Sequence, residues 1–272
     1  MNNEKMTAYN ILKPILGFIY KLWYNPKIIG KENIPKEGPI LVVGNHVHIM
    51  DQCNIIISTK RPLHYMAKKE YFDGKFAWFF KLVNCIPVDR SKKDEEATSL
   101  AIEVLKNNQA LGLFPEGTRN NLKEEKIKEL YEYYADESID YLEFSKKVSN
   151  NKASQVNFLE DLLHKKVITK DEFLDNLSDA DSFLNDLVIN HRITKEEYFT
   201  NLLLPFKFGA VSMASKTSSY LVPYAITGKY KFRSKDLTIN IGKPFKATED
   251  LERANQRLTE EIVNLLKENL TK

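Results

Sequence analysis

The chain has 272 residues, of which 43% are hydrophobic and 28% charged, and this length and composition exclude wholesale disorder, a collagen-like chain and low-complexity sequence. Cys53 and Cys85 are the only cysteines, which excludes a disulfide framework, a thiolate zinc cluster and a secreted mini-fold. The net charge of +3 gives no reason to expect a nucleic-acid partner.

The first predicted element is an apolar helix over residues 8–24. Its 17 residues include Lys13, Pro14 and Lys21, so it falls short of the roughly 20 apolar residues that a spanning helix needs. No cleavage site of the small-x-small kind follows, and a signal peptide is not expected. Aromatic residues mixed with lysines suit a helix in the lipid headgroup region, and the alternative is a helix docked on the core. We expect residues 1–34 to form an N-terminal interfacial helical segment.

Alternating strands and helices are predicted along the next part of the chain. The strand candidates are the short apolar runs at residues 39–44, 63–67, 85–88 and 111–114. Apolar residues at helical spacing occur at residues 46–59, 75–83 and 95–107. This alternation is typical of an α/β layer fold.

Residues 120–204 differ from the rest of the chain in charge. They hold 11 Lys and Arg against 18 Asp and Glu, whereas the remainder holds 29 against 19. The sequence therefore predicts an acidic segment within a basic body.

The acidic segment contains an internal repeat. Residues 158–177 and 183–202 align without a gap at an offset of 25 residues. Thr169 with Glu172, and Thr194 with Glu197, have the spacing of capping boxes, which predicts a helix-turn-helix unit twice over. The units resemble short helical-hairpin modules of the SHOCT type. Because two units are fewer than a free-standing array needs, we expect them to pack on each other, on residues 130–144 or on a partner.

Strands and helices resume after the acidic segment. The predicted elements are a helix at residues 206–216, strands at 220–227 and 237–241, and a helix at 248–269. Thr248, Glu249 and Asp250 supply N-terminal capping chemistry for the last helix.

His46 and Asp51 follow directly on the first predicted strand of the body, where α/β proteins place functional groups. If a helix begins just after His46, Asp51 can accept a hydrogen bond from one imidazole nitrogen and leave the other as a general base. The alternatives are an ordinary surface pair, or a metal site that also includes His48. No further His or Cys clusters follow, so no metal site is predicted.

Three further groups lie beside predicted strands. Residues 114–119, Phe-Pro-Glu-Gly-Thr-Arg, form a turn suited to phosphate or carboxylate recognition, or to a structural ion pair. Arg90 ends the run 84–90, with neighbouring Asp89 as an alternative partner. Pro223 within the apolar run 222–226 predicts an edge strand or a ligand-facing strand end.

In their order and spacing these four blocks resemble the glycerolipid acyltransferase family, typified by 1-acyl-sn-glycerol-3-phosphate acyltransferases. The resemblance covers roughly residues 35–119 and 205–242. It implies an α/β fold with a mixed sheet flanked by helices. The acyltransferase domain would then comprise residues 35–119 and 205–272, interrupted by an all-helical insertion at residues 120–204.

The resemblance also implies an activity. An acyl group would move from an acyl carrier protein or coenzyme A thioester to the sn-2 hydroxyl of 1-acyl-glycerol-3-phosphate, giving phosphatidic acid for phospholipid biosynthesis. His46 would take the hydroxyl proton and Asp51 would orient His46. The phosphate would be bound by Arg90, Glu116, Gly117 and Arg119, and Pro223 would lie on the acyl-donor side. No metal or cofactor beyond the acyl donor is expected.

Partners and alternatives follow from the same resemblance. We expect peripheral attachment to the anionic cytoplasmic face of the cell membrane, with a possible protein partner for residues 120–204. The acceptor could instead be another lysophospholipid or glycerol 3-phosphate. As an alternative function of another class, the protein could be an inactive membrane adaptor that uses the helical insertion. A third alternative is a metal-dependent hydrolase.

Overall fold

The computed structural model describes residues 3–89, 91, 94–135 and 139–271. The chain forms two compact units. Unit 1 comprises Met1–Gly117 and Phe206–Lys272, and unit 2 comprises Thr118–Pro205. The insertion expected at residues 120–204 corresponds to unit 2.

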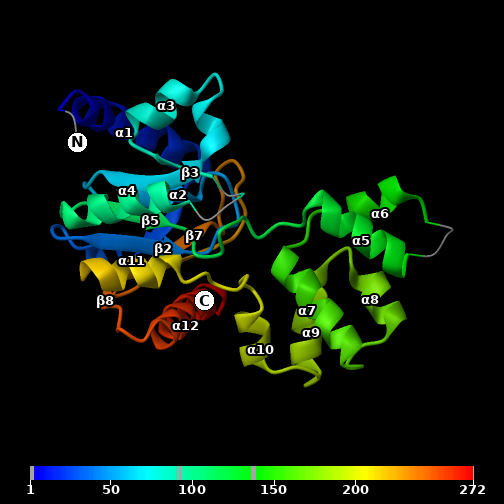
Figure 1. The fold of residues 1–272 in the computed structure, drawn as a ribbon. Helices are drawn as coiled ribbons and strands as arrows, with labels where there is room; N and C mark the ends of the chain where they lie inside the picture. Colours follow the sequence, from blue (N-terminus) through cyan, green and yellow to red (C-terminus); the bar gives the residue numbers. More distant parts are fainter. Residues whose placement is uncertain (1–2, 90, 92–93, 136–138, 272) are drawn as a thin grey trace. The chain divides into compact units, whose positions relative to one another are not determined.

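Unit 1 is built on one mixed sheet (Figure 1). Its strands are β1 (Lys27–Ile29), β2 (Ile40–Gly44), β3 (Leu63–Lys68), β4 (Ile86–Val88), β5 (Ala110–Leu113), β6 (Tyr220–Thr227), β7 (Thr238–Ile241) and β8 (Phe245–Lys246). The strand order is β1-β7-β6-β2-β5-β3-β4, and β8 pairs with β6. All these pairs are parallel except β6 with β7 and β6 with β8. The mixed sheet implied by the family resemblance is therefore present.

Helices cover both faces of this sheet. They are α1 (Asn3–Tyr24), α2 (Asp51–Ile56), α3 (Ala77–Leu82), α4 (Glu95–Lys106), α11 (Gly209–Thr217) and α12 (Leu251–Leu270), with 3₁₀ turns at Lys31–Asn33 and Lys69–Phe72. Helix α1 packs beside α2 and α3, while α11 packs against α4 and α12 (Figure 1). The central strand β2 is buried along its whole length, as its continuous apolar run predicts.

Several boundaries differ from the sequence predictions. The helix expected from residue 46 begins at Asp51, and the last helix takes Asp250 as its N-cap, whose carboxylate accepts a hydrogen bond from the amide of Arg253 (3.0 Å). Strands β1 and β8 were not predicted, because three and two residues are too short to show a period. Among the described residues, no helix combines the length and the apolar content that crossing a membrane requires.

Unit 2 is helical. Its elements are α5 (Glu124–Tyr134), α6 (Tyr141–Val148), α7 (Ala153–His164), α8 (Lys170–Asn176), α9 (Ala180–Ile189) and α10 (Lys195–Thr200). Leu130, Leu159, Phe173 and Leu184 are buried within it, so it has an apolar core of its own. Helix α7 packs on α9, and the ring of Phe173 lies 4.9 Å from that of Tyr134 in α5. The repeats thus pack on each other and on the preceding helices.

The repeat is visible in the backbone of unit 2. Both expected capping boxes form, Thr169 with Glu172 and Thr194 with Glu197. The turn before each box contains a left-handed residue, Lys166 (φ 59°) and His191 (φ 57°), again 25 positions apart. In each turn the amide of the next residue donates a hydrogen bond to a carbonyl of the preceding helix: Val167 to Leu162, and Arg192 to Leu187, both at 2.9 Å. Helices α7 and α9 therefore end in the same way.

Removal of unit 2 is expected to leave a folded unit 1. The amide of Lys207 donates a hydrogen bond to the carbonyl of Pro115 (2.9 Å), so the chain leaves and re-enters unit 1 at one place. A short Gly/Ser linker from Gly117 to Phe206 can then replace residues 118–205 without strain. We expect a soluble protein with one cooperative thermal transition in circular dichroism. Insoluble protein, or loss of that transition, would show that unit 1 depends on unit 2.

Candidate active site

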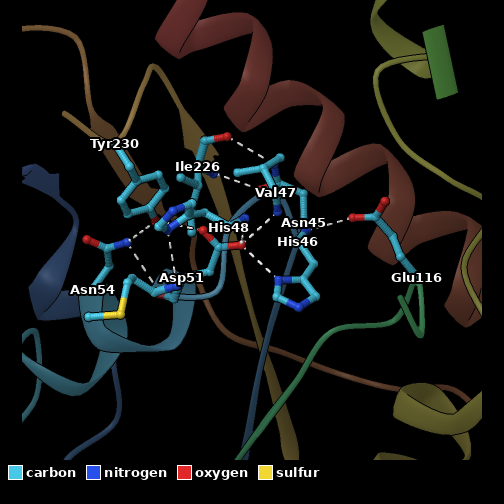
Figure 2. A network of polar contacts seen from close by, with 10 residues as sticks. Asn45, His46, Val47, His48, Asp51, Asn54, Glu116, Ile226 and Tyr230 are labelled. Carbon is cyan, nitrogen blue, oxygen red and sulfur yellow. Dashed lines mark hydrogen bonds and ion pairs between the residues drawn. The ribbon is translucent and has the colours of Figure 1, made fainter. Parts of the chain in front are cut away.

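The segment after β2 is fixed by contacts with β6. The ring of Tyr224 lies over Gly44, where a Cβ would come within 2.4 Å of it. The side chain of Asn45 extends the ladder beyond the end of β2: its Oδ1 accepts a hydrogen bond from the amide of Ile226 (2.7 Å), and its Nδ2 donates to the carbonyl of the same residue (2.9 Å). Residue 46 therefore leaves the sheet at a defined point (Figure 2).

Asp51 is fully buried and lies against the backbone that precedes it. Its Oδ2 accepts hydrogen bonds from His46 Nδ1 (2.8 Å), the Val47 amide (2.7 Å) and the His48 amide (2.8 Å). These bonds hold residues 47–50 in a tight turn, which is why helix α2 begins at Asp51 and not just after His46. The pairing predicted for His46 and Asp51 is present, but a turn and not a helix forms it (Figure 2).

The hydrogen bonds fix the orientation of His46. A carboxylate can only accept, so Nδ1 carries the proton and Nε2 of the neutral ring is the basic nitrogen. The ring stacks on Phe114 at a centroid distance of 3.9 Å and an interplanar angle of 13°. The imidazole is thus held by an apolar surface and a buried carboxylate, as a general base requires.

Glu116 holds the backbone of the same histidine. It is buried, and its Oε1 accepts a hydrogen bond from the His46 amide (2.7 Å) (Figure 2). The family resemblance implied that Glu116 binds the phosphate of the acceptor. The structure directs its carboxylate at the His46 backbone, so Glu116 positions His46, and its role in phosphate binding stays a prediction.

His48 does not join His46 and Asp51 as a third metal ligand. Its ring stacks on Tyr230 (4.1 Å), and its Nδ1 accepts a hydrogen bond from the Met50 amide (3.2 Å). Among the described residues, no three His, Cys, Asp or Glu side chains are grouped to hold a metal ion.

Comparison with known proteins assigns this sequence to a family. The model of the acyltransferase family matches residues 25–227, which are three quarters of the chain and include His46, Asp51 and Glu116. The chain belongs to the acyltransferase family.

Individual relatives agree. Over 115 residues the acyltransferase is 30% identical to the 1-acyl-sn-glycerol-3-phosphate acyltransferase of Bacillus subtilis, covering 42% of this chain and 58% of that protein. The yeast enzyme of the same name, from Saccharomyces cerevisiae, is 32% identical over 127 residues, which cover 43% of this chain and 37% of the relative. The matches thus span less than two thirds of either relative. The crystal structure of the 1-acyl-sn-glycerophosphate acyltransferase from Thermotoga maritima has the same fold, with a TM-score of 0.58, 18% identity, and coverage of 100% of this chain and 85% of that one.

Residues 114–119 of the acyltransferase form a turn at the end of β5. Gly117 has φ +70°, and its amide donates a hydrogen bond to the carbonyl of Phe114 (3.0 Å). Lys207 lies over it: a Cβ at Gly117 would be 2.9 Å from Lys207 Nζ. A glycine with positive φ lets the lysine ammonium approach the turn closely. Lys207 was not among the predicted site residues, although it lies within the sequence Pro205-Phe206-Lys207-Phe208-Gly209.

The other predicted site residues of the acyltransferase have different placements. Arg119 is exposed and belongs to unit 2, two residues along the chain from Gly117. Arg90 lies outside the described residues. Pro223 is buried and pairs with Val43 of β2, so it contributes to the sheet, and its place on the acyl-donor side stays a prediction.

The edge position expected for Pro223 is wrong, since β6 is central. On one side β6 pairs with β2, and on the other its two antiparallel partners divide: β8 pairs with residues 220–221 and β7 with residues 224–227. Pro223 falls between them, and its carbonyl accepts a hydrogen bond from the Gly242 amide (2.8 Å). The missing N–H faces this gap, where it leaves no ladder bond unmade.

Proposed function

We propose that this protein transfers a fatty acyl group from an acyl thioester to the sn-2 hydroxyl of 1-acyl-glycerol-3-phosphate, forming phosphatidic acid. The observation that carries the proposal is the 2.8 Å contact between His46 Nδ1 and Asp51 Oδ2 at the end of β2, in a chain of the acyltransferase family. The identity of the acceptor in this proposal is taken from the names of the relatives.

The reaction needs a base and a position for the acceptor. His46 Nε2 takes the proton of the acceptor hydroxyl as its oxygen attacks the thioester carbonyl. The new C–O ester bond forms, the C–S bond breaks, and the departing thiolate takes the proton from His46. Because the thioester is already activated, no covalent acyl-enzyme is required. Asp51 stabilises the imidazolium that exists between the two proton transfers.

The acceptor phosphate would bind beside the turn after β5. Gly117 and Lys207 offer a glycine turn and an ammonium within one small region. Arg90 and Arg119 remain the arginines proposed from the family resemblance. A phosphate bound here would direct the hydroxyl of the same molecule toward His46, because β2 and β5 are neighbours in the sheet.

The acceptor is a lipid, and α1 offers a surface for a lipid interface. Several of its large apolar side chains are exposed: Ile11, Ile15, Leu16, Phe18, Ile19, Leu22 and Trp23. Trp23 packs edge-on against exposed Phe232 (5.0 Å), and the Arg233 amide donates a hydrogen bond to the Trp23 carbonyl (2.6 Å). An exposed apolar face flanked by Lys21 and Arg233 suits peripheral binding to an anionic leaflet, and we propose the cytoplasmic one.

The acyl donor would be acyl carrier protein or coenzyme A thioester. Both are acidic, and the chain outside residues 120–204 holds 29 Lys and Arg against 19 Asp and Glu. A protein partner for the acidic unit 2 remains part of the same proposal.

The test is acyl transfer by the purified full-length protein on phosphatidylglycerol-containing vesicles. A long-chain acyl-coenzyme A and the matching acyl carrier protein thioester are offered with lysophosphatidic acid, with other lysophospholipids and with glycerol 3-phosphate, each separately. We expect transfer to lysophosphatidic acid at a kcat/KM at least about tenfold above the other acceptors, since a missing phosphate or acyl chain removes a binding contact.

Two outcomes would contradict the proposal. Preference for another acceptor would leave the acyl-transfer chemistry in place and change the substrate. No transfer from either donor to any acceptor, by folded protein bound to the vesicles, would favour the membrane-adaptor reading.

A further inference from the structure

Tyr230 contacts the candidate catalytic pair but lies outside the four sequence blocks. It follows β6, and its hydroxyl donates a hydrogen bond to Asp51 Oδ1 (2.6 Å) (Figure 2). His46 uses the other oxygen, Oδ2. The rotation of a carboxylate about its last bond is soft, so its plane is set by its partners. Tyr230 holds the far oxygen, and together with the two amide bonds to Oδ2 it sets the plane of the carboxylate that faces His46.

Asn54 determines the direction of this contact. Its Nδ2 donates a hydrogen bond to the Tyr230 hydroxyl (2.6 Å). The hydroxyl has one proton, which is given to Asp51, so it accepts from Asn54. Burial, and then the charge of Asp51, raises the pKa of Tyr230 far above its usual value. Tyr230 therefore stays protonated at neutral pH and is the donor to Asp51.

The chain of hydrogen bonds continues to α1. Asn54 is fully buried, and its Oδ1 accepts a hydrogen bond from the hydroxyl of Tyr20 (2.8 Å). Burial raises the pKa of Tyr20 as well, so it also stays protonated. Tyr20 is on the buried face of α1, whereas Phe18 and Leu22 on the same helix are 68% and 62% exposed.

Ring contacts make a second connection between α1 and Tyr230. Tyr24 lies 5.0 Å from the ring of Tyr20 and 5.5 Å from that of Tyr230. Helix α1 is thus joined to Tyr230 both by hydrogen bonds through Asn54 and by aromatic packing. If α1 shifts, either the Tyr230 hydroxyl moves with it or one of these contacts breaks.

We propose that Tyr230, Asn54 and Tyr20 are positioning residues that couple the seating of α1 to the orientation of Asp51 and His46. This inference rests on the proposed function, and it makes the rate of acyl transfer depend on the helix proposed to bind the lipid surface. The ordered directions of the three hydrogen bonds and their lengths of 2.6–2.8 Å carry it.

Tyrosine-to-phenylalanine variants test the proposal, since each removes one oxygen and keeps the ring. For Tyr230→Phe we expect kcat to fall about tenfold, the size of one lost hydrogen bond to a charged group, with KM for lysophosphatidic acid within about twofold of wild type. Tyr20→Phe should lower kcat by a smaller factor, roughly threefold. In the double variant Tyr20→Phe should add little, because its effect passes through Tyr230.

Tyr9→Phe is the matched control. Tyr9 is also buried on α1, but its hydroxyl accepts a long hydrogen bond from the Leu63 amide (3.4 Å) and contacts neither Asn54 nor Tyr230 in the described hydrogen bonds. Its kcat should equal that of wild type. Equal effects of Tyr9→Phe and Tyr20→Phe, or an unchanged kcat in Tyr230→Phe, would overturn the proposal.

A spectroscopic measurement separates this inference from the proposed function. The far-downfield proton resonance of His46 Nδ1–H, assigned by its absence in His46→Ala, reports the bond to Asp51 without any substrate. It should move in Tyr230→Phe and Tyr20→Phe and stay in Tyr9→Phe. If these shifts occur in a protein that transfers no acyl group, the coupling holds and the function fails. If transfer occurs and the resonance is the same in all variants, the coupling fails.

Discussion

Replacing His46 with alanine is expected to lower kcat/KM for acyl transfer by about 10²–10⁴-fold, the contribution of a positioned general base. The two other titratable side chains of the motif have different contacts: Asp51 is fully buried and bonds to the imidazole, and His48 stacks on Tyr230 and accepts a hydrogen bond from the Met50 amide. KM for the acceptor should change little, because the base acts on the transition state. Steady-state kinetics on vesicles measure both constants.

His191→Ala is the matched control for this variant. His191 is exposed in the helical unit 2 and lies outside the sequence blocks that carry the predicted site residues. Its kcat/KM should be that of wild type. Thermal unfolding of both variants would show whether the fold is retained. Activity of His46→Ala within a few-fold of wild type would remove the assignment of His46 as the base.

Replacing Gly44 with alanine is expected to destabilise unit 1 strongly. A Cβ at Gly44 would lie 2.4–2.6 Å from three atoms of the Tyr224 ring, which is fully buried. The ring cannot retreat, since it packs within the main apolar core with Val42 and Ile55. We expect a loss of about 3 kcal/mol in the free energy of unfolding of unit 1, which corresponds to roughly 6–12 °C in Tm.

Gly209→Ala controls for the change from glycine itself. Gly209 begins α11, and a Cβ there would have no atom within 4 Å. Its free energy of unfolding should stay within about 0.5 kcal/mol of wild type. Circular dichroism during heating measures both variants. A Gly44→Ala protein as stable as the Gly209→Ala protein would show that the Tyr224 ring can move away.

The sequence predicted the parts of the fold that have a strong apolar period or a long apolar run. Residues 39–44 and 220–227 became β2 and β6, and residues 95–107 became α4. The short strands β1 and β8 have no period to detect. The edge position predicted for Pro223 was wrong because a proline is also compatible with a central strand at the point where two partner strands divide. Such a point can be identified only when the strand order is known.

Within the candidate site, sequence analysis found the pair His46 and Asp51, because both lie in one short motif at a strand end. Tyr230 and Asn54 could not be found in this way. Tyr230 is 179 residues from Asp51 along the chain and lies in a loop without periodic pattern, so only the fold brings it to the carboxylate. Glu116 was found by its motif, but its contact with the His46 backbone depends on the neighbouring positions of β2 and β5.

The matching turns of unit 2 make its size adjustable in fixed steps. Lys166 and His191 occupy equivalent left-handed positions, and the capping boxes that follow them are equivalent too. A cut at one turn and a join at the other would remove or duplicate 25 residues while every helix keeps its own start and end signals. A chain shortened or lengthened in this way would differ from this one by whole helical hairpins of unit 2, while the segment that carries His46 in unit 1 would be unchanged.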